Sequence, residues 1–124
     1  MRHYRVTLAD ALAAHDFALQ YEGRPGILNL DMVQAAIARP YNGYFRSMDR
    51  KAAALLDAVA RYHDFVDGNK RTAVLLLELM LGRSGYRLGA GDDELEEMTV
   101  AVADGQVPLE RLTEWLCPQL HRIA

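Results

Sequence analysis

Residues 63–77, with the sequence HDFVDGNKRTAVLLL, join a polar loop to a strongly apolar stretch. Apolar residues continue to Leu81, and the stretch ends at Gly82 or Gly85. They fall nearly all round a helix that begins near Asn69, which is typical of a helix buried on most sides. The segment therefore predicts a central buried helix with a polar loop at its N-terminus, around which the rest of the chain packs.

Helical spacing recurs on the N-terminal side of this segment, where glycine and proline interrupt it. A first helix is predicted over residues 8–19, with Thr7 as its N-cap. A second covers about residues 29–38 and stops before Pro40, because proline disfavours helical geometry in the residue before it. A third helix is predicted over residues 47–59, with its apolar side facing the core.

Two more helices are predicted after the central one. The fifth begins at Asp92 or Asp93, runs to about Asp104 and ends at Gly105. The sixth has Pro108 in its first turn, where the missing N–H costs nothing. No stretch sustains the alternation of apolar and polar residues that marks a strand. The sequence predicts one all-α domain of about six helices spanning residues 1–124.

The composition is that of an ordinary soluble globular protein, with 51% hydrophobic and 25% charged residues. The net charge of −3 excludes a global cationic field that would attract nucleic acid. Cys117 is the single cysteine, so a disulfide within the chain is impossible, and its apolar helical setting predicts a small core residue. Because the sequence shows neither a membrane-spanning run nor a signal sequence, a cytoplasmic location is expected.

The loop before the central helix has the features of an anion site. Gly68 would stand just before the helix, so the amides of Asn69, Lys70 and Arg71 fall in the first turn, where no helical acceptor reaches them. These donors and the positive end of the helix dipole favour an anion. The side chains of Lys70 and Arg71 point about 100° apart and can reach different phosphates of one polyphosphate chain.

Other residues of the loop supply further parts for phosphoryl or nucleotidyl transfer. Asp67 offers a hard oxygen ligand of the kind that Mg²⁺ uses together with phosphates and water. Histidine side chains ordinarily have a pKa of about 6.5, so His63 can take a proton from an attacking hydroxyl. Phe65 is expected to plug into the core and hold the loop. Composition alone also allows a solvated turn, because Asp-Gly-Asn is a common turn sequence.

The segment HDFVDGNKRTA resembles the signature H-x-F-x-[D/E]-[A/G]-N-[G/K]-R of the Fic/Doc family, in its death-on-curing version. The resemblance extends over nearly the whole chain. It includes the following pieces: Leu12-Ala13-Ala14-His15, Tyr21-Glu22-Gly23, Gly26, Ala38-Arg39-Pro40 and Ser84-Gly85-Tyr86-Arg87-Leu88.

The resemblance implies the Fic fold, with ATP and magnesium as cofactors. Fic proteins in general transfer AMP to a hydroxyl of a target protein. The death-on-curing branch instead phosphorylates a threonine of elongation factor Tu, which arrests translation, and a partner antitoxin holds it inactive. On this resemblance His63 is the general base, Asp67 the magnesium ligand, residues 68–71 (Gly68, Asn69, Lys70 and Arg71) the phosphate-binding cradle and Phe65 a structural residue.

Two positions favour the kinase branch, and a third departs from the family. Lys70 replaces the second glycine of the AMP-transferring motif, and Val74 replaces its second arginine. Asp64 stands where the family has proline or an aliphatic residue, and we expect its carboxylate to point to solvent. The family's self-inhibitory motif [S/T]-x-x-x-E-[G/N] is absent from the sequence, so restraint would have to come from another chain.

Several alternatives remain open from the sequence. The chain could be an AMP transferase, or a catalytically silent module that binds an antitoxin. A metal-dependent phosphohydrolase is suggested by the dipeptide His63-Asp64, but suitable further histidine ligands are lacking. The aromatic loop 41–45 could position a target or simply pack down. Arg61 could contact phosphate or lie at the surface, and His15 is expected to be a satisfied core histidine.

Overall fold

The computed structural model describes residues 3–20, 23–27, 29–62 and 64–123. Among these residues the chain forms six α-helices: α1 (Leu8–Ala18), α2 (Leu30–Ala38), α3 (Met48–Arg61), α4 (Asn69–Arg83), α5 (Asp92–Ala103) and α6 (Leu109–Leu116). Short 3₁₀ turns follow α2 (η1, Arg39–Tyr41) and α6 (η2, Cys117–Gln119). The predicted all-α Fic fold is confirmed, and no helix of the described part is long and apolar enough to cross a membrane.

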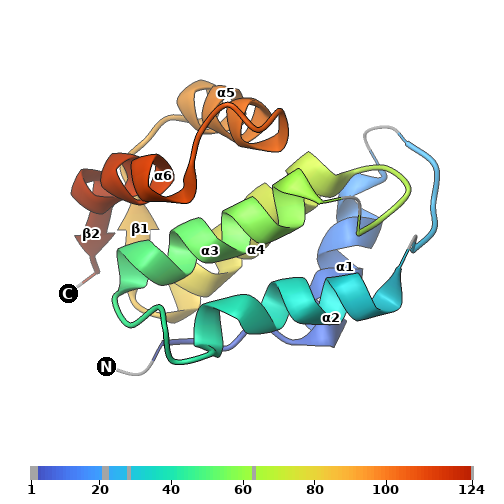
Figure 1. The fold of residues 1–124 in the computed structure, drawn as a ribbon, viewed down its shortest axis with the longest axis horizontal. Helices are drawn as coiled ribbons and strands as arrows, with labels where there is room; N and C mark the ends of the chain where they lie inside the picture. Colours follow the sequence, from blue (N-terminus) through green and yellow to red (C-terminus); the bar gives the residue numbers. More distant parts are fainter. Residues whose placement is uncertain (1–2, 21–22, 28, 63, 124) are drawn as a thin grey trace.

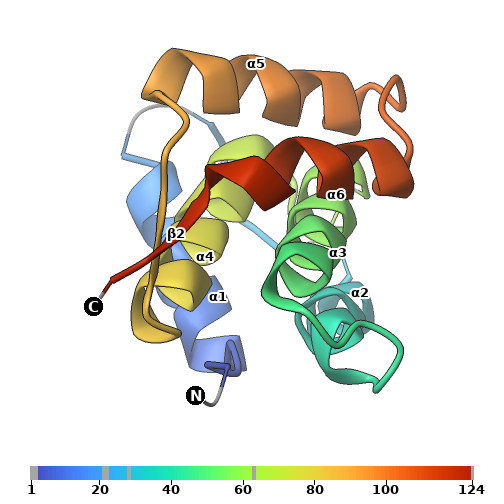
Figure 2. The ribbon, with the colours of Figure 1, turned by 90° about the vertical axis from the view of Figure 1, so that its left-hand side faces the viewer.

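The helices are arranged in three layers. Figure 2 shows α5 and α6 above, α3 and α4 in the middle, and α1 and α2 below. Figure 1 shows α3 and α4 running side by side through the centre. Because the middle layer is covered on both sides, it carries most of the core, and the site loop that joins its two helices is held between the outer layers.

The central position is shared by two helices, and α3 is the more completely buried. Every residue of α3 from Ala52 to Ala60 is buried, whereas α4 exposes Lys70 and Glu78. Alanines make up most of this part of α3 and let neighbouring helices approach closely from several sides. The sequence had indicated only one apolar side for α3.

The predicted N-cap of α1 is present, and α2 also begins with a side-chain cap. The Thr7 hydroxyl accepts a hydrogen bond from the Asp10 amide at 3.1 Å, and the Asp10 carboxylate accepts one from the Thr7 amide at 2.9 Å. This reciprocal pair is a capping box. Asn29 caps α2 by accepting from the Met32 amide at 3.2 Å. The start of each helix is therefore fixed by a local capping side chain.

The prediction that the chain has no strands is wrong at two short segments. Strand β1 (Tyr86–Leu88) pairs antiparallel with β2 (Leu120–Arg122), with Leu88 opposite Leu120. Each strand has three residues, which is too short for an alternating pattern to stand out in the sequence. The pair ties the C-terminus back to the end of α4.

Cys117 is exposed in η2, so its assignment to the core is also wrong. Pro118 follows it directly, and α6 ends at Leu116, one residue before Cys117. The apolar pattern of α6 is carried instead by Leu112 and Leu116, which are fully buried, while Trp115 packs half-buried against the core. Helix α6 thus ends one residue before Cys117, and the cysteine is not carried into the core.

The aromatic loop between α2 and α3 packs down for the most part. Phe45 is buried, and the Tyr41 hydroxyl donates to the Tyr4 carbonyl and accepts from the Val6 amide at 3.1 Å. Tyr44 is 76% exposed. The packing interpretation therefore holds for Tyr41 and Phe45, and only Tyr44 is displayed to solvent.

We expect Tyr41→Phe to lower the free energy of unfolding by about 1–2 kcal/mol, because two backbone groups lose their hydrogen-bond partner. Tyr44→Phe is the matched control and should leave stability unchanged, since that ring is exposed. Urea denaturation of both variants measures the difference. Equal stability of the two variants would show that the Tyr41 hydroxyl does not hold the N-terminal segment.

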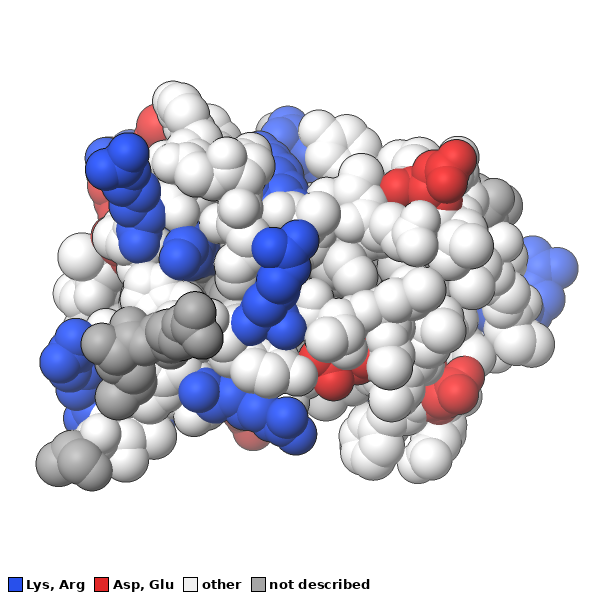
Figure 3. All heavy atoms as spheres, turned by 90° about the horizontal axis from the view of Figure 1, so that it is seen from below, with Lys and Arg blue, Asp and Glu red and all other residues white. Residues whose placement is uncertain are grey.

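Charged side chains are unevenly distributed despite the small net charge. Figure 3 shows a face on which Lys and Arg clearly outnumber Asp and Glu, whereas the first turn of α5 carries Asp92, Asp93 and Glu94. The Arg5 guanidinium and the Lys51 ammonium lie 5.2 and 5.8 Å from the centre of the Tyr41 ring. The pKa of His3 is lowered by partial burial and then by the charge of Lys51.

Candidate phosphate and metal site at the start of α4

The loop that leads into α4 is anchored by an aromatic stack. Phe65 is 1% exposed, and its ring lies 3.9 Å from the His15 ring with an interplanar angle of 12°. His15 Nε2 donates to the Asp67 carbonyl at 2.8 Å. Phe65 is therefore the predicted structural plug, and His15 is the predicted satisfied core histidine. Its role, which the sequence did not reveal, is to fix the backbone of Asp67 from α1.

Asn69 closes the loop through its side chain. Its amide oxygen accepts from the Phe65 amide at 3.0 Å, and its amide nitrogen donates to the Phe65 carbonyl at 3.0 Å. Both ends of the side chain are thus engaged within the loop. Within the cradle the Asn69 side chain therefore acts first as a clamp on the loop, while its backbone N–H lies in the first turn of α4.

Gly68 gives the cradle its backbone geometry. It is the N-cap of α4 with φ of 81°, a left-handed conformation that favours glycine. The first helical bond of α4 runs from the Thr72 amide to the Gly68 carbonyl at 2.9 Å. No described side chain caps this helix, and its first turn contains no acidic residue. Because no carboxylate lies within this first turn, the positive end of the α4 dipole suits an anionic ligand.

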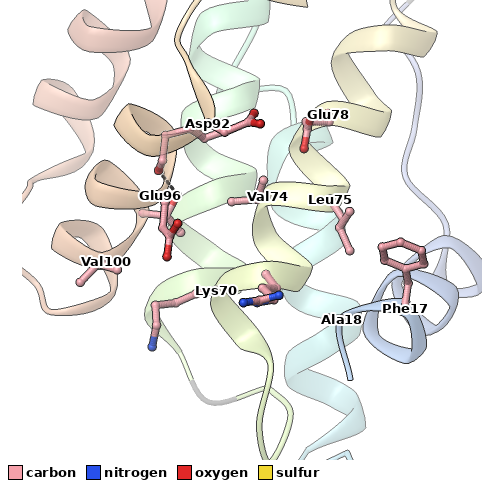
Figure 4. A pocket seen from close by; sticks show the side chains of 12 residues that line it. Phe17, Ala18, Lys70, Val74, Leu75, Glu78, Asp92, Glu96 and Val100 are labelled. Atoms are coloured by element: carbon pink, nitrogen blue, oxygen red, sulfur yellow. Dashed lines mark hydrogen bonds between the residues drawn. The ribbon is translucent and has the colours of Figure 1, made fainter. Parts of the chain in front are cut away.

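Lys70 and Arg71 lie at the edge of a groove of about 540 Å³ between α1, α4 and α5. Figure 4 shows Lys70 near the loop end of this groove and Glu78 with Asp92 at the opposite end. Val74 lines the wall between these ends. Desolvation and the neighbouring Asp92 raise the pKa of Glu78. The groove therefore has a basic end beside the cradle and an acidic end far from it.

Asp67 lies beside the cradle with its carboxylate half-exposed. One oxygen, Oδ2, accepts from the Arg24 amide at 3.0 Å and lies 4.0 Å from the Arg24 guanidinium. The other oxygen accepts no hydrogen bond from the described residues and is free to bind a cation. These residues also contain no group of three His, Cys, Asp or Glu that could hold a metal alone. Asp67 therefore fits an ion such as Mg²⁺ that takes one carboxylate and completes its shell with phosphates and water.

His63, the predicted general base, lies outside the described residues. Its neighbours on both sides are described, and one of them corrects a prediction. Asp64 does not point to solvent: it is 1% exposed, and neither carboxylate oxygen accepts a hydrogen bond from any described residue. Burial raises the pKa of Asp64 to about 7. The Asp64 carbonyl also accepts from the Asn29 amide at 3.3 Å, so the residue lies against the start of α2.

Arg61 is paired within its own helix. Its guanidinium lies 3.5 Å from the Asp57 carboxylate, and Arg39 reaches the same buried carboxylate at 2.8 Å. Of the two interpretations offered by the sequence, a phosphate contact therefore has no support, and Arg61 shares a structural ion pair. The pairing of Arg39 with Asp57 was not foreseen, since eighteen positions separate them.

Comparison with known proteins identifies the family. The profile of the Fic/DOC family matches residues 5–81, which run from before α1 almost to the end of α4 and include the whole site loop. The chain belongs to the Fic/DOC family. The resemblance drawn from the motif is thereby confirmed.

Two relatives place this Fic/DOC chain in the death-on-curing branch. It is 31% identical over 121 residues to "Protein kinase doc" of Escherichia phage P1, with 94% of each chain covered. It is also 39% identical over 90 residues to "Toxin Doc" of Mycolicibacterium smegmatis, covering 68% of this chain and 67% of that protein. The first similarity extends beyond the family profile into α5 and α6.

Proposed function

We propose that the chain is the toxin of a toxin–antitoxin pair and that it acts as a protein kinase. It would transfer phosphate from ATP to a threonine of elongation factor Tu and so arrest translation in the cytoplasm. The observation that carries the proposal is the start of α4: Gly68 opens an uncapped helix whose first turn bears Lys70, in a chain similar to a protein kinase. The relatives named as Doc support the toxin role.

The residues of the loop divide the work. The backbone N–H groups of residues 69–71 would bind the phosphates, and Lys70 would add charge to them. Asp67 would hold Mg²⁺, which when bound neutralises phosphate charge and polarises the group to be transferred. His63 would take the proton from the threonine hydroxyl. Phe65, through its stack on His15, and Asn69, through its two hydrogen bonds to Phe65, hold residues 65–69 in place beside the phosphates.

The structure bears on the alternative of AMP transfer through two positions. Lys70 and Val74 both line the groove where the AMP-transferring motif has glycine and arginine. An apolar residue at Val74 offers no contact to a phosphate, and this favours transfer of the terminal phosphate. The protein should be incubated with elongation factor Tu and ATP labelled at the γ-position or the α-position. Transfer from the γ-position alone is expected, and transfer from the α-position alone would establish AMP transfer.

A second alternative is a catalytically silent module that binds an antitoxin. It predicts that His63→Ala arrests growth as strongly as the wild type, whereas the kinase proposal predicts that this variant is harmless. An antitoxin partner is itself part of our proposal, since the chain lacks the family's self-inhibitory motif. Co-expression with the protein encoded beside it would test for such a partner.

We expect Lys70→Ala to lower the rate of phosphate transfer at least about tenfold, because a charge-assisted hydrogen bond to phosphate is worth about 1.5–3 kcal/mol. Lys70 is exposed, so the thermal stability of this variant should equal that of the wild type. Arg50→Ala, an exposed cation on α3, is the matched control. A transfer rate unchanged by Lys70→Ala would remove this residue from the cradle.

A further inference from the structure

A second hollow lies on the other side of the site loop. It has a volume of about 300 Å³ and is walled by α2, by Arg39 at the start of η1, by α3 and by residues 62 and 64. Met32, Ala35 and Ala58 make its walls largely apolar. It is separate from the groove beside the cradle, and the two share no lining residue. No part of the kinase proposal uses it.

Asp64 lines this hollow and is its unusual member. Its carboxylate is buried, and neither oxygen accepts a hydrogen bond from the residues that the structure describes. The charged groups on the adjoining elements are engaged elsewhere: Arg39 and Arg61 both pair with Asp57. Neither arginine lies within 4.0 Å of Asp64. A buried carboxyl group without a partner is costly, which makes a donor from outside the chain favourable here.

The rim of the hollow is apolar and exposed. Tyr62, Met32 and the neighbouring Leu30 are large apolar side chains that remain 36–47% exposed. Clustered exposed apolar residues are typical of surfaces that contact another protein. An apolar surface suited to a partner protein therefore surrounds the hollow, and the hollow contains one buried acceptor, the Asp64 carboxylate.

We propose that this hollow binds the side chain of a lysine residue presented by a partner protein. The ammonium group donates to the Asp64 carboxylate, and the four-carbon stem lies against Met32, Ala35 and Ala58. Lysine fits better than arginine, because the hollow offers a single carboxylate, whereas a guanidinium has five donors to satisfy. The Tyr62 ring at the rim can add a cation–π contact. The partner would then lie directly against the loop that carries the predicted catalytic residues.

The binding should first be measured with n-butylammonium as a probe of the side chain and n-butanol as its uncharged analogue, by NMR titration at pH 8. We expect saturable binding of butylammonium alone, at least tenfold weaker in Asp64→Asn. Asp31→Asn, an exposed carboxylate on α2, is the matched control and should bind like the wild type. Equal binding of butanol, or binding unaffected by Asp64→Asn, would overturn the proposal.

Two further arms test the pocket and the protein source. Ala35→Leu should block the hollow from its exposed edge and abolish butylammonium binding, whereas Ala38→Leu, also exposed on α2, should not. A peptide with the sequence Leu-Lys-Leu between alanines should bind more tightly than butylammonium and lose its affinity when norleucine replaces lysine. A peptide that binds no more tightly than butylammonium would overturn the assignment to a protein partner.

Discussion

Asp64→Asn should make the protein more stable than the wild type at pH 8, and the advantage should fade as the pH falls. In the folded state burial raises the pKa of Asp64 to about 7, above its ordinary value of 3.8. Between these two values the folded chain holds a proton that the unfolded chain has released, so stability falls as the pH rises. Above pH 7 the free energy of unfolding of the wild type is lowered by the full cost of ionising the buried carboxyl, which is about 4 kcal/mol for a shift of this size.

Asparagine has nearly the same shape and no charge, so it removes the cost of ionisation and leaves the packing intact. Urea denaturation should show a gain in stability for Asp64→Asn of about 1 kcal/mol at pH 4.5 and about 4 kcal/mol at pH 8. Asp31→Asn should show neither effect, because that carboxylate is exposed. If the stability of the wild type relative to Asp64→Asn does not change with pH, the Asp64 carboxyl has access to water or to a partner.

The sequence predicts the helices well because each is marked by local chemistry. Thr7 and Asn29 cap helices that begin where predicted, and Gly68 precedes α4 as the polar loop indicated. The three-residue strands were missed since their pairing depends on residues more than thirty positions apart. The burial of α3 on all sides was also missed, because it follows from how the layers stack and leaves no mark in the helix itself.

Residue types identify the site loop, but tertiary contacts decide what each side chain does. The motif predicts Asn69 as a phosphate ligand. In the structure its side chain instead makes two hydrogen bonds to the backbone of Phe65. Asp64 reads as a solvated loop residue, because polarity in a loop usually means exposure. In the structure it is buried, and its backbone contacts Asn29 at the start of α2, a tertiary contact that no local pattern encodes.

Phe65→Ala should have the largest effect on folding, lowering the free energy of unfolding by about 3–5 kcal/mol, as is typical for truncation of a fully buried phenylalanine. The ring stacks on His15, and the residue pairs with Ile27 through an isolated bridge. Its loss would leave a cavity between α1 and the site loop. Denaturation by urea measures the change, and Tyr44→Ala, which truncates an exposed aromatic ring, should cost little.

Phe65→Leu keeps most of the buried volume and separates the two roles of the residue. It should fold, with a cost of at most about 1.5 kcal/mol, but it lacks the flat ring that stacks on His15. We expect faster hydrogen exchange at the Val66 amide, which donates to the Gly26 carbonyl at 3.0 Å, together with a reduced rate of phosphate transfer. The Asn69 side chain still holds the backbone of residue 65, so the effect should stay within the loop. Hydrogen exchange in α3 should therefore be unchanged. Slow exchange at Val66 with a normal transfer rate would mean that the Asn69 clamp alone positions the loop and that the stack serves only stability.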